Sequence, residues 1–259
     1  MRDFTLGKYC ELCEDILDSG YKVFTVQSYL QKRPGSDFVI LRHDVDSKPQ
    51  KALKMAEMES QMGISSTYYF RSTKSVFIPK IIEKVYAKGH EIGYHYEVLS
   101  KAQGNFKEAI RLFERELDEF KKICDIDTIC MHGSVLSRYD NRTLWNLYDF
   151  RDFGIIGEAY LSMGENFHYF SDTGWEWSNK HKMRDIMPFK KDELFVSSTA
   201  DLTGAIINNK LNNIYLLVHP GNWADSFHNW CHILIENKVF NIGKELLRFM
   251  NYHEDRKSY

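Results

Sequence analysis

The chain has 259 residues, 43% of them hydrophobic, which suits one large domain with a sizeable core. Its formal net charge of -2 gives no overall field to attract nucleic acid or an anionic membrane surface, so neither is expected as a partner. The longest apolar run, Ile214 to Val218, is far shorter than the roughly 20 residues of a membrane helix, and the N-terminus lacks the apolar core of a signal peptide, so we expect no membrane insertion and a cytoplasmic location.

Near the N-terminus, Cys10 and Cys13 form a CxxC pair. They share helical spacing with Tyr9 and Ile16, and no second thiol pair or histidine lies nearby in the sequence, which favours helix packing over redox or zinc chemistry. The five cysteines are odd in number and scattered, as is typical of reduced thiols. The sequence leaves the oligomeric state open.

The first clear strand and helix follow one another directly. Phe38 to Leu41 is apolar and predicts a strand. Ser47-Lys48-Pro49-Gln50 then has the S-x-x-Q form of a capping box with an early proline, which predicts a helix that ends at Gly63.

The same alternation continues. The pattern predicts strands over Ile64–Phe70 and Glu91–His95, with a helix over Pro79–Lys88 between them that Gly89 stops. From Phe106 to Cys124, apolar residues recur every three or four positions, which predicts a long helix with one buried stripe.

The remaining elements are less regular. Strands are predicted at Thr128–Met131, Gly154–Gly157, Ile214–Val218, within FHYFSDTGWEW and at Asp185–Phe189, and helices near Arg142–Tyr148 and from about Asn229. About seven strands alternating with helices indicate an α/β fold, an incomplete (β/α) barrel of parallel strands, with an open doubly wound sheet as the alternative. No linker or repeat interrupts the chain, so residues 1–259 are interpreted as a single domain.

Polar side chains cluster at the carboxyl ends of the predicted strands. Asp44 and Asp46 follow the first strand, His95 and Glu97 the third, His132 the fourth and His219 the last. In parallel barrels and open α/β sheets these ends share one ligand-binding face, so the side chains are expected to converge.

RHDVD places two carboxylates two positions apart. In an extended segment Asp44 and Asp46 point to one side, and such close carboxylates are tolerated mainly when a cation or a shared proton relieves their repulsion. The structural alternative is that Asp46 offsets a helix dipole and that Asp44 pairs with an arginine such as Arg42 or Arg71.

The histidines divide by position. His90, at a strand start, is interpreted as a hydrogen-bonded structural residue. Asp46 and His95, with either Glu97 or His132, would form an N/O donor set suited to Zn²⁺ or a related divalent metal. His219 is the candidate acid, since a histidine can donate a proton near neutral pH.

Tryptophans lie near these candidate site residues in the sequence. Trp175, Trp177 and Trp223 lie in loops near the predicted site, where they would either pack against sugar rings or fill the barrel rim.

Four segments, LRHDVDSKP, GISSTYYF, GHEIGYHYE and LLVHPGNW, resemble in order and spacing the polysaccharide deacetylase family, or NodB-homology domain, in its HDVD-containing bacterial branch. The likeness spans about residues 38–223. It implies a distorted (β/α) barrel and a metal-dependent hydrolase that removes an N- or O-linked acetyl group from a carbohydrate, with an aspartate base and a histidine acid.

The resemblance assigns Asp44 as the base, His95 as the first metal histidine and His219 as the acid. It departs from the family pattern at three points. Val45 follows Asp44, so the metal aspartate shifts to Asp46; Leu99 occupies the usual second metal histidine, so Glu97 or His132 must complete the site; and CMHGS replaces the arginine-bearing middle motif. Asp172 and Trp175, with Trp223, are the predicted substrate contacts.

The predicted function is deacetylation in surface-polysaccharide metabolism, with a divalent metal, zinc expected, and an intracellular sugar precursor as the substrate. The departure at Leu99 motivates a second hypothesis, a catalytically decayed protein that binds carbohydrate. A third hypothesis is a metal-free glycosidase that uses two carboxylates, for example Asp44 and Glu97.

Overall fold

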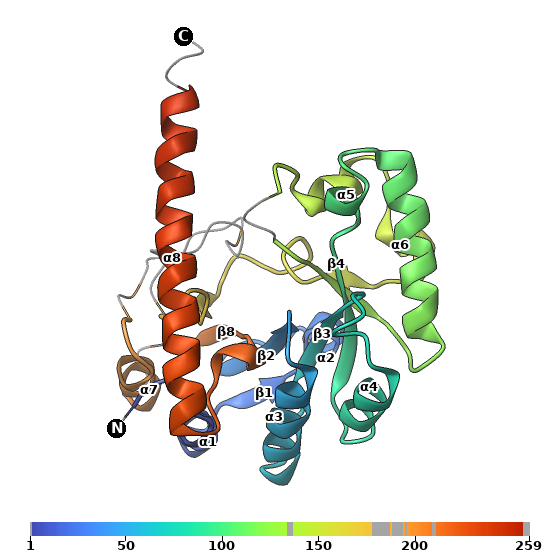
Figure 1. Ribbon diagram of the computed structural model, residues 1–259. Coiled ribbons are helices and arrows are strands. Elements are labelled where there is room, and N and C mark those ends of the chain that lie inside the picture. Colours follow the sequence, from blue (N-terminus) through green and yellow to red (C-terminus); the bar gives the residue numbers. More distant parts are fainter. Residues whose placement is uncertain are drawn as a thin grey trace.

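The computed structural model describes residues 2–133, 137–177, 187, 194, 196–208 and 211–255. Every strand pairing in this part of the chain is parallel, and all the strands belong to one sheet (Figure 1). The strands are β1 (Lys22–Phe24), β2 (Phe38–Val45), β3 (Thr67–Arg71), β4 (Glu91–Tyr96), β5 (Thr128–Met131), β6 (Gly157–Glu158), β7 (His168–Ser171) and β8 (Asn213–Val218).

The strand order distinguishes a barrel from a doubly wound sheet. The order is β6-β5-β4-β3-β2-β8-β7, with the short β1 beside the first half of β2. Strands β2 to β6 follow one another in sequence order, and the last strand, β8, returns beside β2. A doubly wound sheet would instead reverse at a switch point. Because β6 and β7 do not pair in the described chain, the sheet is a half-barrel, and the predicted α/β fold class is confirmed.

Most of the helices lie around the sheet, while the long C-terminal helix extends well past it (Figure 1). Those of eight or more residues are α1 (Leu6–Asp18), α3 (Pro49–Gln61), α4 (Pro79–Tyr86), α6 (Phe106–Lys121), α7 (Thr199–Ile207) and α8 (Phe227–Asp255). The shorter ones are α2 (Val26–Lys32), α5 (Val98–Lys101) and the 3-10 helices η1 (Asn141–Asn146), η2 (Phe150–Phe153) and η3 (Pro220–Asn222). None of the described helices is long and apolar enough to cross a membrane.

Alternation along β2 separates two cores. Phe38 and Ile40 face the interior of the half-barrel, where they join the core that contains Tyr69 and Tyr215. Val39 and Leu41 face the opposite side and pack in a second core with residues of α1 and α7. All eight residues of β2 are buried, as expected of a parallel strand that is covered on both faces.

Most predicted elements occur close to their predicted bounds, and Thr128–Met131 matches β5. Three predictions were wrong in detail. The N-cap of α3 is Lys48, in the left-handed region at φ 52°, so Ser47 does not form a capping box. The segment near Arg142–Tyr148 forms η1 rather than an α-helix. The strand predicted at Gly154–Gly157 begins only at its last residue, because Gly154 ends η2 with a positive φ.

Other elements were missed or are untested. The sequence pattern did not predict β1, α2, α5 or α7, which are short segments of 3, 7, 4 and 9 residues. The predicted strand Asp185–Phe189 lies outside the described residues, apart from Met187. The predicted helix around Cys10 and Cys13 is α1, and Cys13 packs in the second core.

Candidate active site

The predicted site residues come together at the carboxyl ends of the strands. Asp44 is the second-to-last residue of β2 and Asp46 follows that strand directly, while His95 lies in β4. His132 follows β5 and His219 follows β8. The convergence expected for a parallel half-barrel is therefore present.

Asp46 lies at the centre of this group. Its Oδ1 is 3.3 Å from Nε2 of His95 and 3.6 Å from Nε2 of His132. Its Oδ2 is 4.0 Å from Nε2 of His219. The Oδ1 atom is buried and has no hydrogen-bond partner among the described residues.

Each of the three histidines is held through its other ring nitrogen. Nδ1 of His95 contacts the carbonyl oxygen of Cys130 at 3.0 Å, Nδ1 of His132 contacts Glu97 at 3.0 Å, and Nδ1 of His219 contacts Asp172 at 2.6 Å. Carbonyl and carboxylate oxygens only accept hydrogen bonds, so each Nδ1 carries the proton. In the neutral rings, each Nε2 therefore directs a lone pair toward Asp46.

This arrangement favours positive charge at its centre. Three imidazole lone pairs and a carboxylate repel one another unless a bound cation or protons on the rings supply that charge. The donor set of one carboxylate and two or three imidazoles suits Zn²⁺. Asp46, His95 and His132 thus offer donor types that a divalent metal accepts, and their Nδ1 contacts are of the kind that orients metal-binding histidines.

Charge effects in the site follow the same geometry. Burial favours the protonated form of Asp46, but the imidazoles of His132, His95 and His219 outweigh it and hold the pKa of that carboxyl well below its usual range. Burial lowers the pKa of His95, yet the Asp44 and Asp46 carboxylates raise it above its ordinary value. Positive charge is favoured at this point of the molecule.

A second donor set overlaps the first. Asp44, His95 and Cys130 are buried, and each offers a donor atom within 4.8 Å of the others, so they too could hold a metal. However, the guanidinium of Arg42 lies 3.5 Å from Asp44 and would repel a cation there. We therefore favour the set centred on Asp46, which has no guanidinium ion pair among the described residues.

Asp44 is buried beside an arginine. Arg42, fully buried in the half-barrel, pairs with Asp44 at 3.5 Å and donates to the Tyr215 hydroxyl at 3.0 Å. Its guanidinium also lies over the Tyr160 ring, 4.3 Å from the centroid. The pairing of Asp44 with an arginine, one of the alternatives from the sequence, is present together with the convergence on His95, whose Nε2 is 3.8 Å away.

Glu97 does not face Asp46. It receives hydrogen bonds from Arg71 at 2.8 and 3.0 Å in addition to the one from His132. Burial acts against its ionisation, but His132 and Arg71 lower its pKa to about 2. A carboxyl group with that pKa is ionised near neutral pH, which argues against Glu97 as the acid of a two-carboxylate glycosidase.

The predicted substrate contacts are placed differently from expectation. Asp172 is fully buried, and its carboxylate accepts hydrogen bonds from His219 and from the indole nitrogen of Trp223. Trp223 is also fully buried, so both side chains support His219 from behind. Trp175 is partly exposed, packs at a tilt against the rings of Phe4 and Trp230, and donates from its ring nitrogen to the carbonyl of Asn222.

One residue of the site was not singled out from the sequence. Cys130, with Sγ 3.8 Å from Asp44, precedes His132 by two positions. In a strand, residues two apart share a face, so the same parity argument that paired Asp44 with Asp46 would have found it.

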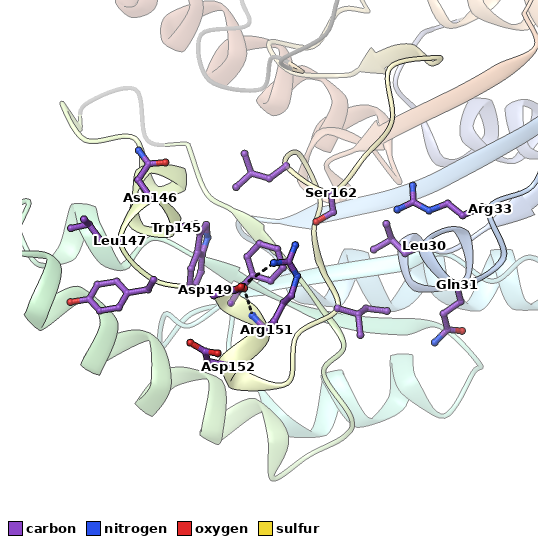
Figure 2. Close-up of a pocket in the computed structure, with 14 residues that line it drawn as sticks. Leu30, Gln31, Arg33, Trp145, Asn146, Leu147, Asp149, Arg151, Asp152 and Ser162 are labelled. Carbon is purple, nitrogen blue, oxygen red and sulfur yellow. Dashed lines mark hydrogen bonds and ion pairs between the residues drawn. The ribbon is translucent and has the colours of Figure 1, made fainter.

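One cavity in the described part of the chain lies elsewhere. It has a volume of about 970 Å³ and is lined by residues of α2, η1, η2 and the segment after β6, among them Arg33, Trp145 and Ser162 (Figure 2). Asp149 and Arg151 pair with one another across 2.9 Å, and no histidine lines the cavity. We therefore place the candidate active site at Asp46 and not in this cavity.

Comparisons with known proteins give similarity of structure only. No family model and no curated protein match the chain. A carbohydrate esterase of family 4 from Streptococcus mutans shares 16% identity with it at a TM-score of 0.47, over 92% of this chain and 90% of that one. A family 4 carbohydrate esterase from Bacillus anthracis shares 13% at 0.37, over 94% and 86%, and a peptidoglycan N-acetylglucosamine deacetylase shares 15% at 0.40, over 78% and 81%.

Proposed function

We propose that the protein is a metal-dependent hydrolase that removes an N- or O-linked acetyl group from a carbohydrate, in surface-polysaccharide metabolism. The observation that carries the metal-dependent part is the direction of three imidazole Nε2 atoms toward the Asp46 carboxylate. The order and spacing of the four motifs that resemble polysaccharide deacetylases support the acetylated carbohydrate as the substrate.

Asp46, His95 and His132 would hold the metal. When bound there, a divalent ion, for which we propose zinc, supplies Lewis-acid chemistry to an acyl carbonyl. The three donors come from the ends of three different strands, and the fold brings both histidines within 3.6 Å of Asp46 Oδ1.

Asp44 and His219 would move the protons. Asp44, held beside Arg42 as a carboxylate, accepts a proton from the attacking water as its oxygen adds to the acyl carbon. His219 donates a proton from Nε2 to the leaving nitrogen or oxygen, and acetate and the free sugar amine or alcohol result. Asp172 holds Nδ1 of His219 at 2.6 Å, which orients the ring and stabilises its charged form.

The competing hypothesis is a decayed enzyme that binds carbohydrate. It was motivated by Leu99 in the place of a metal histidine, and Leu99 is indeed buried in α5, away from solvent. His132 nevertheless supplies a third donor atom next to Asp46. This favours the hydrolase.

The test measures metal and chemistry separately. Protein purified without chelator or affinity nickel is analysed for metals by mass spectrometry, and acetate release from acetylated amino sugars is then assayed with and without chelator. We expect bound divalent metal and chelator-sensitive acetate release. Protein without metal and without chelator-sensitive hydrolysis of several substrates would support the binding protein instead.

A further inference from the structure

The carboxylate of Glu97 accepts a hydrogen bond from His132 and is itself bound by Arg71; we call Arg71 and Glu97 the clamp. Nδ1 of His132 donates to Glu97 Oε2 at 3.0 Å. Arg71 donates to the same carboxylate from Nη2, at 2.8 and 3.0 Å, and from Nε at 3.3 Å. Arg71 also donates to the backbone carbonyl of Asp46 at 3.4 Å, so one guanidinium ties the support of His132 to the residue that His132 faces.

In the clamp, both carboxylate oxygens of Glu97 are occupied by hydrogen bonds, which leaves no lone pair for a metal. Oε1 of Glu97 accepts two hydrogen bonds from Arg71, and its Oε2 accepts one from Arg71 and one from His132. The side chain is only 10% exposed. Charge-assisted, forked contacts of this kind fix a carboxylate in both position and orientation.

The clamp also decides which nitrogen of His132 is available. A carboxylate can only accept, so the proton of the neutral ring lies on Nδ1 and the lone pair lies on Nε2, 3.6 Å from Asp46 Oδ1. Without Glu97, the ring could rotate or exchange tautomers. It would then present an N–H to the proposed metal.

We propose that Arg71 and Glu97 are positioning residues that fix His132 as the Nδ1–H tautomer and so make it, and not Glu97, the third metal ligand. This inference rests on the proposed metal site. It also accounts for a third donor although Leu99 stands at the position of the second metal histidine. His132, which follows β5, would replace that histidine, and Glu97 would orient it.

The tautomer is measurable without metal or substrate. Apo protein labelled with ¹⁵N at histidine is examined by long-range ¹H–¹⁵N correlation NMR over a series of pH values, and the tautomer is assigned from the spectra in which the His132 ring is neutral. We expect His132, assigned from its absence in H132A, to show a protonated Nδ1 and an unprotonated Nε2. A protonated Nε2 would overturn the inference.

The substitution Glu97→Leu removes the acceptor and keeps the side-chain size similar. We expect the His132 signals to move toward the Nε2–H tautomer and the zinc affinity, measured by competition with a chromophoric chelator, to fall about 10- to 100-fold. Glu119→Leu is the matched control, because Glu119 is exposed and pairs only with Lys122 among the interactions found, at the far end of α6. It should leave both readouts unchanged, and equal zinc affinity in Glu97→Leu and the wild type would contradict the proposal.

The two hypotheses fail in different ways. A protonated Nδ1 on His132 in a protein that binds no zinc would leave the clamp intact and remove the proposed function. Zinc binding with Nε2 of His132 protonated would support a metal enzyme and remove the clamp. If Glu97→Leu does not fold, the tautomer of the wild-type protein still decides the matter.

Discussion

Nε2 of His95 lies 3.3 Å from Oδ1 of Asp46, although His95 belongs to β4, Asp46 follows β2, and β3 runs between them. The half-barrel brings them together because its parallel strands end at one rim. The consequences of this contact can be tested one side chain at a time.

The substitutions His95→Ala and His132→Ala should each lower metal occupancy, since each removes one of three proposed donors. The zinc-dependent rise in melting temperature should also shrink, because only an ion that binds the folded state stabilises it. Metal analysis and thermal unfolding with and without zinc would check this. His228→Ala, an exposed histidine at the start of α8, is the control and should behave like the wild type. Full zinc occupancy in both H95A and H132A would place the metal elsewhere.

The substitution His219→Ala should keep the metal and lower kcat by about 10²- to 10⁴-fold, the usual contribution of a general acid. Asp172→Asn should reproduce much of this loss, because the amide can donate to Nδ1 and favour the wrong tautomer. Steady-state kinetics together with metal analysis distinguish these effects. If both variants retained full activity, His219 would not be the acid.

A buried network behind β2 should make the protein sensitive to acid. Glu59 is fully buried and accepts hydrogen bonds from Tyr9, His43, Ser66 and Tyr68. Burial raises the pKa of Glu59, but the imidazoles of His43 and His90 and the Ser66 hydroxyl outweigh it and lower the pKa from 4.5 to about 2.

The direction in which stability changes with pH follows from this lowered pKa. Ionised Glu59 contributes stability above its usual pKa of 4.5, and the contribution is lost as the pH falls from there toward about 2. Glu59→Gln should therefore lower the free energy of unfolding at neutral pH by about 3–5 kcal/mol and flatten its fall in acid. Denaturant unfolding at neutral pH measures the loss of stability, and denaturant unfolding between pH 4.5 and about 2 measures its fall in acid. Glu119→Gln, at an exposed pair, should cost less than about 1 kcal/mol, and an equal loss in the two variants would contradict the role of the network.

Gly93, in the GHEIGYH motif, is required by packing. A Cβ there would collide with the Tyr69 ring and lie 3.0 Å from the carbonyl oxygen of Thr128. Tyr69 cannot readily move, because its hydroxyl is hydrogen-bonded to Thr128 Oγ1 at 2.8 Å in the core. Gly93→Ala should destabilise the protein by about 1–3 kcal/mol in denaturant unfolding. Gly204→Ala in α7, where a Cβ meets nothing within 4 Å, should be neutral or stabilising.

The sequence by itself determined the main secondary-structure elements and the meeting of polar residues at the carboxyl ends of the strands. Apolar runs followed by helical periodicity predicted the parallel α/β fold, and the positions of Asp44, Asp46, His95, His132 and His219 after those runs predicted that they would meet. These inferences succeed because the alternation of side chains along a strand is a local property, and because strands joined by helices in repeated βα units run in one direction and end at the same edge of the sheet.

Only the tertiary structure decided which nitrogen faces which oxygen. Spacing alone left Glu97 and His132 as equal candidates, and it placed Asp172 against the substrate. The fold instead pairs Glu97 with Arg71 and buries Asp172 behind His219. These choices depend on partners distant in the chain, and a side chain's hydrogen bonds are set by neighbours that periodicity does not reveal. For the same reason, the sequence pattern did not predict β1 and α2. These short segments are stabilised by contacts with distant residues, such as the hydrogen bond from the Val26 amide to Thr67.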